Sequence, residues 1–320
     1  MFIHKEKPIT FFFATDIHGS DLCWRKLVNT GGFYDVDTII LGGDITGKGT
    51  QFILEEKPGV WVTDFLGVDV RAESEEALSK LEMRVRNAGF YPYRANQEEF
   101  TKFSSSATYR DQVFQEVVKR AVNNWIEYAE NKLKGTGRRI IVTAGNDDPE
   151  FIDDLFQHSD VIQWAERKIV YLDDDHEILN EGYSNHTPWN THREYDEDRL
   201  LEVLTAQAEQ LKDVKNAIFN IHVPPYGSQI DNAPLMDAQL RPVDGGQTLV
   251  PVGSTAVRKL IETYQPMLGL HGHIHEAKGS TKIGRTICIN PGSTYGEGFL
   301  SGVLINLDKK GVRSFQPVQG

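Results

Sequence analysis

Residues 266–279 read PMLGLHGHIHEAKG and place three of the ten histidines of the chain, His271, His273 and His275, within five positions. The apolar residues before them predict a buried strand that ends where the histidines begin. A single histidine at such a place most often makes a structural contact. Three histidines in alternation raise the hypothesis of a metal site, because imidazole is the commonest protein ligand for transition metals.

The composition predicts a soluble globular protein with room for one large α/β domain. The chain has 320 residues, of which 39% are hydrophobic and 25% are charged. It has no apolar run long enough for a membrane span, and the apolar stretch near the N-terminus is too short for a signal peptide. Cys23 and Cys288 are too few for a disulfide framework. We therefore expect a cytoplasmic protein that makes no membrane contact.

The charge of the chain restricts its partners. The formal net charge is −12, so the surface repels phosphate backbones and nucleic acid is disfavoured as a partner. A small anionic substrate stays open, because bound metal ions can reverse the field inside a cleft. No residue pattern indicates an oligomeric state.

Short apolar runs, each followed by a turn signal, predict buried strands. These runs are ITFFFATD, DTIILGGD, RRIIVTAGND, NAIFNIHV, MLGLHGHIH, RTICINPGS and LSGVLINLD. Amphipathic patterns predict helices at residues 196–213 and 254–264, the second with Ser254 as its N-cap. Strands that alternate with helices predict a layered α/β fold.

Residues 49–138 interrupt this alternation. They show no strong strand pattern, and they predict helices at residues 74–87 and 110–133. The segment is too long for a plain connection between two strands. We predict one domain over residues 1–320 in which residues 49–138 form a mainly helical insertion. The insertion could cover the functional site or be a structural elaboration away from it.

Polar residues follow five of the predicted strands. They are Asp16 and His18, then Asp44, then Asn146 with Asp147 and Asp148, then His222, and finally His273 with His275. In open α/β sheets the carboxyl ends of the strands form the edge where ligands bind. Each motif alone is weak, since Asp16 could cap a helix, the Gly-Gly-Asp and Gly-Asn-Asp runs could be turns, and His222 could be a core histidine. Their order behind successive strands makes coincidence a poor explanation.

The residue types fit a pair of cations. An aspartate and a histidine two positions apart can bind one ion, and Asp44, which follows two glycines, can be approached from several sides like a bridging carboxylate. A mixture of imidazole, carboxylate and amide ligands favours transition metals. Two such metals about 3.5–4 Å apart can hold a phosphoryl group for in-line attack.

In this order, DIHG, GGD, GND, HVPP and GHIH resemble the motifs of the calcineurin-like metallophosphoesterases. The resemblance covers most of the chain outside the insertion and implies a four-layer α-β-β-α sandwich of two mixed β-sheets. It also implies two divalent transition-metal ions (Mn, Fe, Zn or Ni), with Asp44 bridging them. The implied ligands are Asp16, His18 and His275 for one metal, and Asn146, His222 and His273 for the other. His271 matches no ligand position, and we expect it to be structural.

The resemblance implies an enzyme that hydrolyses phosphate esters, in which a hydroxide between the metals attacks phosphorus. Asp44, Asn146 and Asp147 are the implied catalytic residues. Asp147 is a departure, because many members of the family have at this position a histidine that stabilises the transition state. We therefore expect phosphodiesters or activated phosphomonoesters as substrates. The alternative is a catalytically weak scaffold or binding protein with the same fold, which the intact ligand set disfavours.

Two residues are candidate substrate contacts. Arg193 lies in the polar stretch GYSNHTPWNTHRE, and its guanidinium could bind a phosphate through two hydrogen bonds. It could equally pair with Glu194 or Asp196 at the surface. Tyr226 lies in PPYGSQIDNAPLMD, directly after His222, and could stand at the mouth of the site.

Overall fold

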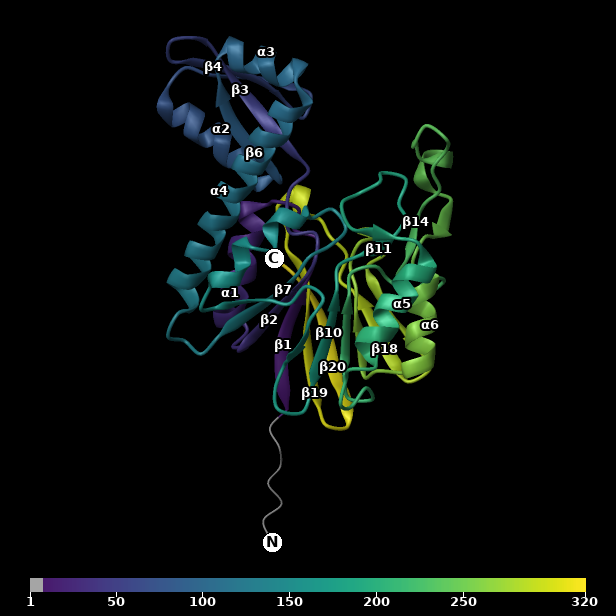
Figure 1. Ribbon diagram of the computed structural model, residues 1–320. Helices are drawn as coiled ribbons and strands as arrows, with labels where there is room; N and C mark the ends of the chain where they lie inside the picture. Colours follow the sequence, from purple (N-terminus) through teal and green to yellow (C-terminus); the bar gives the residue numbers. More distant parts are fainter. Residues whose placement is uncertain (1–7) are drawn as a thin grey trace.

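The protein is described by a computed structural model that covers residues 8–320 (Figure 1). The part of the amino-terminal stretch before Pro8, which was weighed above as a signal peptide, lies outside the described residues. Two six-stranded sheets form the body of the molecule. None of the helices within residues 8–320 combines the length and the apolar character needed to cross a membrane.

The first sheet combines four parallel strands with an antiparallel pair at one edge. Its strands are β1 (Ile9–Ala14), β2 (Thr38–Gly42), β7 (Arg139–Thr143), β8 (Ile162–Trp164), β19 (Ser301–Asp308) and β20 (Gly311–Gln319), in the order β20-β19-β1-β2-β7-β8. Because β1, β2 and β7 are parallel, the residues that follow them lie at one edge of this sheet.

The second sheet is also mixed, with a parallel centre. Its strands are β9 (Ile169–Tyr171), β10 (Glu177–Glu181), β13 (Ile218–Ile221), β16 (Leu268–Leu270), β17 (Gly279–Ile283) and β18 (Thr286–Asn290), in the order β17-β18-β16-β13-β10-β9. All of the strands predicted from apolar runs are present in one of the two sheets.

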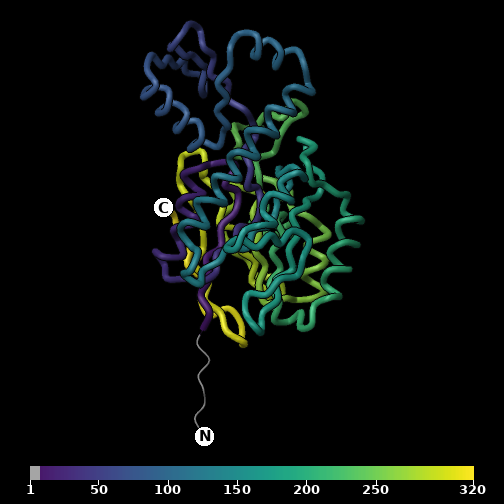
Figure 2. Tube along the Cα trace, turned by 60° about the vertical axis from the view of Figure 1, so that its left-hand side comes forward, coloured from purple at the N-terminus to yellow at the C-terminus, as the bar shows by residue number. Residues whose placement is uncertain are grey.

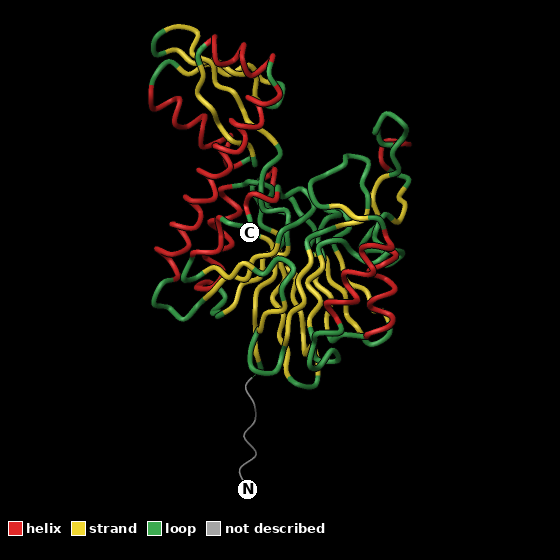
Figure 3. Tube along the Cα trace, viewed as in Figure 1, coloured by secondary structure: helices red, strands yellow, loops and turns green. Residues whose placement is uncertain are grey.

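Two helices cover the outer face of each sheet (Figures 1 and 3). These are α1 (Asp21–Phe33) and α4 (Ala107–Leu133) on the first sheet, and α5 (Glu197–Ala208) and α6 (Thr255–Tyr264) on the second. Alternation along β1 connects the layers, since Phe12 packs under α1 and α4 while Phe11 and Phe13 face the second sheet. The predicted α-β-β-α sandwich is confirmed.

The predicted helix ends are only partly right. α6 begins after Ser254, whose side chain accepts a hydrogen bond from the Val257 amide as an N-cap does, and the prediction for this helix is confirmed. α5 is shorter than predicted and ends at Ala208.

Short connecting elements complete the body. These are the pairs β11 (Ser184–Asn185) with β12 (Glu194–Tyr195) and β14 (Asn232–Pro234) with β15 (Leu249–Pro251), and four 3-10 helices at Glu150–Ile152, Leu155–His158, Val243–Gly246 and Tyr295–Glu297.

Residues 49–138 contain a sheet that the sequence pattern missed, so the expectation that this segment has no strong strand is wrong, and the helices are joined by a four-stranded sheet. The strands are β3 (Gly49–Lys57), β4 (Val60–Phe65), β5 (Val68–Ala72) and β6 (Phe90–Ala95), in the order β5-β4-β3-β6, and the helices are α2 (Glu75–Asn87), α3 (Gln97–Ser105) and α4. The helices predicted at 74–87 and 110–133 are confirmed as α2 and α4. The strands escaped notice because few of their residues are fully buried and charged residues interrupt their apolar pattern.

The inserted unit is firmly attached to the body. The long helix α4 packs on α3, β3 and β6 near its beginning and on α1 farther along (Figure 2). Between α1 and α4, Trp125 stacks on Trp24 with ring centroids 5.5 Å apart. At the junction the Gly47 amide donates to the Tyr91 hydroxyl at 2.8 Å, and the Ser20 hydroxyl donates to the Asn87 carbonyl at 2.7 Å. The insertion therefore contacts the loops that follow β1 and β2, where ligand residues were predicted.

The contact between Tyr91 and Gly47 is open to a direct test. The Tyr91→Phe variant leaves the buried Gly47 amide without its acceptor, so the free energy of unfolding should fall by about 1–3 kcal/mol. Urea denaturation measures this change. Tyr226→Phe is the control, because the Tyr226 side chain is well exposed and its variant should be neutral. Equal stability of the two variants would show that this hydrogen bond does not attach the insertion.

Candidate metal centre

Five loops bring the predicted ligands to the carboxyl ends of the central strands. Asp16 and His18 follow β1, Asp44 follows β2, and Asn146 follows β7 in the first sheet. The second sheet contributes His222 after β13 and two histidines after β16, which are His273 and His275. Apart from His273 and His275, which are partly exposed, these side chains lie buried where the two sheets meet.

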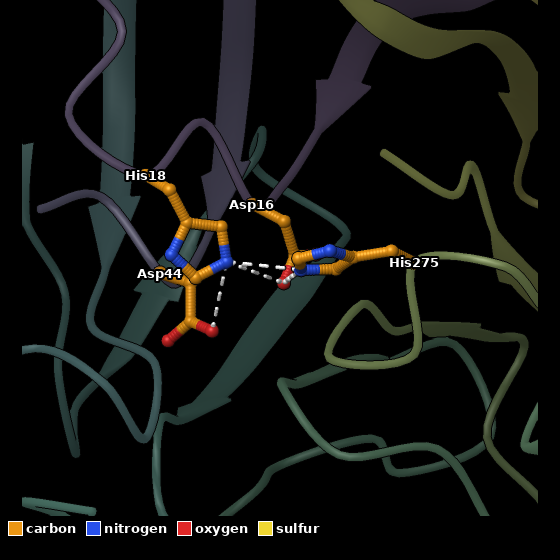
Figure 4. A group of neighbouring side chains, drawn as sticks. All are labelled: Asp16, His18, Asp44 and His275. Carbon is orange, nitrogen blue, oxygen red and sulfur yellow. Dashed lines mark hydrogen bonds and ion pairs between the residues drawn. The ribbon is translucent and has the colours of Figure 1, made fainter. Parts of the chain in front are cut away.

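Four of these residues form a first group of potential metal ligands, which are Asp16, His18, Asp44 and His275 (Figure 4). One ligand atom from each lies within 4.8 Å of all the others. The Nε2 atoms of His18 and His275 are 2.9 Å apart, and His18 Nε2 lies 3.4 Å from Asp44 Oδ2. Atoms that face one another at such separations fit around one ion, because metal bonds to nitrogen and oxygen are about 2.0–2.2 Å long.

Asp44 belongs to a second group, together with His222 and His273. His222 Nε2 lies 3.3 Å from Asp44 Oδ2 and has no hydrogen-bond partner among residues 8–320, while His222 Nδ1 contacts the Gly42 carbonyl at 2.9 Å. The carbonyl fixes the ring orientation, as outer contacts of metal-bound histidines commonly do.

Asn146 presents an amide oxygen without a protein partner among the described residues. Its Nδ2 donates to Thr191 Oγ1 at 2.9 Å, so the Oδ1 atom faces the other way. That oxygen is buried and unpaired within the described part of the chain. Buried polar atoms without partners are costly, and His222 Nε2, another such atom, lies next to Asp44. The residues present therefore fit bound metal ions, and the number of ions and the ligand assignments stay predictions.

The backbone is strained at the same residues. Asp16, His18, Asp44 and His273 have φ angles of 54°, 38°, 48° and 68°, in the left-handed region that side chains other than glycine rarely adopt. Hydrogen bonds hold these conformations, since the amides of Asp16 and His18 donate to the carbonyls of Gly43 and Asp44 at 2.9 Å each. Strain of this kind is concentrated at functional sites.

Two glycines allow the close packing that the sequence led us to expect. A Cβ atom at Gly43 would collide with Nδ1 of His222, and one at Gly272 would collide with the carboxylate of Asp16. Gly43 also has a φ of 113°, which side chains rarely tolerate. Neither position accepts a larger residue without displacing a ligand candidate.

The surroundings shift the pKa values of the site histidines in opposite directions. Burial lowers the pKa of His18 to about 3 and that of His273 to about 4, so both rings keep lone pairs at neutral pH. Burial also acts to raise the pKa of Asp44, but the charge of His222 holds that pKa well below its ordinary value. In return, and against the effect of burial, Asp44 raises the pKa of His222 to about 10. A cation bound here would have to displace the His222 proton.

Asp148 fastens two of the ligand loops together. Its buried carboxylate accepts hydrogen bonds from the amides of Ile45, Thr46 and Gly145, and from the Thr46 hydroxyl. The loop that carries Asp44 is thereby fixed to the loop that carries Asn146. The sequence placed Asp148 beside the ligands but gave no sign of this role.

The structure places Arg193 away from the position predicted for a substrate contact. Its guanidinium is 1% exposed, donates to the carbonyls of Asp148 and Pro149, and pairs with Asp153. The substrate contact is therefore corrected to a structural contact, and the pairing with Glu194 or Asp196 is not observed either. Arg193 is drawn into this buried position by acidic residues that are distant in sequence. Among them is the buried Glu166, 3.9 Å from the guanidinium.

Tyr226 and His271 have simpler environments. The Tyr226 side chain is 44% exposed and its amide donates to the Ser254 carbonyl, so contact with a substrate stays a prediction. His271 is fully buried, with Nδ1 2.8 Å from the Ile221 carbonyl, which is the structural role expected for it.

Sequence reasoning missed two residues at the site. Lys48 pairs with Asp147 at 2.8 Å, and the Tyr295 ring lies 4.8 Å from the ring of His18 and 5.9 Å from that of His275. The only available signals were that Lys48 follows Asp44 by four positions and that Tyr295 closely follows the NPGS stretch. Neither spacing distinguishes a site residue from a solvated loop residue.

Comparisons with known proteins agree with the fold. No family model matches the chain. The chain is 32% identical over 155 residues to the uncharacterized protein MJ1162 of Methanocaldococcus jannaschii, a match that covers 48% of this chain and 63% of that protein. The chain thus spans less than two thirds of the length of this relative.

Solved structures share the fold at low sequence identity. Two of them align with 98% of this chain and 99% of their own, at TM-scores of 0.56 and 0.52 and identities of 15% and 14%, and the second is TT1561 of Thermus thermophilus. Weaker likenesses include an archaeal phosphodiesterase (TM-score 0.35, 12% identity, 98% and 100% of the two chains) and an E. coli phosphoesterase, Yfce (0.34, 11%, 96% and 98%). At those scores the likeness says nothing about the chemistry of this chain.

The corrected place of Arg193 leads to a stability prediction. The Arg193→Ala variant leaves Glu166 and Asp153 without their buried partner, so the free energy of unfolding should fall by about 3 kcal/mol or more. Thermal or urea denaturation measures the loss. Arg199→Ala, which breaks an exposed pair with Glu202, is the matched control and should cost less than about 1 kcal/mol. If Arg193→Ala is as stable as this control, the guanidinium does not hold the Asn146 loop.

Proposed function

We propose that this protein is a dinuclear metal-dependent phosphoesterase that hydrolyses phosphodiesters or activated phosphomonoesters. The observation that supports this best is the shared carboxylate, since Asp44 belongs to two separate groups of potential metal ligands. A bridging carboxylate between two groups rich in imidazole is the arrangement that a pair of transition metals needs. Manganese, iron, zinc and nickel all suit these ligands.

Each ligand has a proposed place. Asp16, His18 and His275 would hold one cation, and Asn146, His222 and His273 would hold the other, with Asp44 between them. Two divalent cations would supply a nucleophile from water at neutral pH and would neutralise charge on a phosphoryl group.

The other side chains of the site prepare this geometry. The Asp147 amide donates to Asp44 Oδ1 at 2.9 Å and so helps to fix the orientation of the shared carboxylate. Thr191 fixes the Asn146 amide, and the Tyr295 ring packs beside His18 and His275. Positioned groups of this kind contribute to catalysis because no reorganisation is needed when charge develops.

The chemistry of the surface favours a small substrate. A net charge of −12 opposes binding of a long polyanion, whereas a single phosphate ester needs only the local field of the cations. The alternative of a scaffold without activity would tolerate lost ligands, but every predicted ligand side chain is present and faces the cluster or is buried beside it. We therefore prefer the enzyme.

The proposal is tested by metal content and hydrolysis together. Elemental analysis of protein purified with added Mn²⁺ should find about two metal ions per chain, and the loaded protein should hydrolyse bis(p-nitrophenyl) phosphate or p-nitrophenyl phosphate. The Asp44→Asn variant should lose bound metal and should lower kcat/KM by about 10²-fold or more. Asp69→Asn on the exposed strand β5 is the matched control and should change neither value. Full metal content without hydrolysis of either ester would favour the scaffold.

A further inference from the structure

Lys48 lies beside the candidate metal centre and has no role in the function proposed so far. Its ammonium group is 2.8 Å from Asp147 Oδ2, and the same oxygen is 3.7 Å from His18 Nδ1. The ammonium therefore stands one carboxylate away from a predicted metal ligand. The carboxylate is that of Asp147, which stands where the sequence resemblance implies a histidine.

The backbone that carries Lys48 is held on several sides. The amides of Ile45 and Thr46 donate to the buried Asp148, and the Gly47 amide donates to Tyr91 of the inserted unit at 2.8 Å. The end of the side chain is free to adjust, since the Lys48 side chain is 56% exposed. A long side chain on a fixed loop can reach a ligand at the cluster without moving the metal ligands.

The pair with Asp147 differs from an ordinary surface ion pair. The Asp147 side chain is only 15% exposed, whereas both side chains of the Lys80–Glu76 pair on α2 are more than two thirds exposed. Exposed ion pairs such as Lys80–Glu76 contribute little to the free energy of folding. The Lys48–Asp147 pair is partly withdrawn from water, so its charges act more strongly on nearby groups.

A count of donors shows what the pair can do. An ammonium group has three N–H donors, and Asp147 accepts one, which leaves two for a ligand. A phosphate ester that approaches the cluster brings negative oxygens close to the Asp147 carboxylate, which would repel them. Lys48 neutralises that carboxylate and offers charged donors to the same oxygens.

We propose that Lys48 binds a phosphoryl oxygen of the substrate, and so supplies the positive charge that a histidine supplies in the proteins this sequence resembles. This inference deepens the proposed function and rests on it. Asp147 is then a positioning residue, which keeps the ammonium beside the cluster and need not touch the substrate. No proton transfer is required of either residue.

Inorganic phosphate serves as a probe that does not depend on turnover. Isothermal titration calorimetry should show that the manganese-loaded protein binds phosphate, and that Lys48→Ala weakens the affinity about tenfold or more. Lys48→Arg should keep most of the affinity, because it keeps the charge. Asp147→Asn should weaken phosphate binding less than Lys48→Ala does, because it loosens the position of the ammonium but also removes a carboxylate that repels phosphate. Lys80→Ala is the matched control and should leave the affinity unchanged.

Hydrolysis and metal content complete the test. In Lys48→Ala, kcat/KM for bis(p-nitrophenyl) phosphate should fall by about 10²-fold, while elemental analysis finds the metal content unchanged. Equal phosphate affinity in Lys48→Ala and the unmodified protein would overturn the inference, and so would loss of metal from that variant, which would make Lys48 a support for the metal loops. Phosphate binding that depends on Lys48 in a protein without hydrolysis would keep the inference and refute the proposed enzyme.

Discussion

The Asp44 carboxylate is the group on which the rest of this structure depends. It lies 3.4 Å from the imidazole of His18 and 3.3 Å from that of His222, so it joins residues that follow the first and the fourth of the strands predicted to carry ligands. Its backbone is in the left-handed region, and its carbonyl accepts the His18 amide. These features make sense together if the carboxylate is shared by two cations, because a bridging ligand must present itself to both.

The two sheets of the sandwich bring together the residues around the Asp44 carboxylate. Parallel strands in each sheet bring loops from distant parts of the chain to one edge, and apolar side chains between the sheets hold those edges together. Burial then makes the site chemically distinct, since it lowers the pKa of His18 and of His273, while Asp44 raises the pKa of His222. Asp148 and Arg193 are not predicted metal ligands, yet they fix the loops that carry such ligands.

The parts that could be predicted from the sequence are those with a strong local signal. Strands buried on both faces are continuous apolar runs, so the central strands of the two large sheets and the residues that follow them could be recognised, whereas β8, β9, β10, β17 and β20 were not. The inserted sheet could not, because its exposed strands mix charged and apolar residues, although the turns at Pro58–Gly59 and Leu66–Gly67 were a sign of it. Arg193 and Lys48 were misjudged or missed for another reason. Their partners Asp153, Glu166 and Asp147 are far away in sequence, and only the folded chain shows which charges meet.

The most direct measurement is anomalous X-ray scattering from crystals of the protein soaked in Mn²⁺. The account predicts two peaks, one on each side of the Asp44 carboxylate and about 3.5–4 Å apart. One peak should be bounded by Asp16, His18 and His275, and the other by Asn146, His222 and His273. Crystals that bind manganese elsewhere, or that show no peak within bonding distance of Asp44, would contradict it.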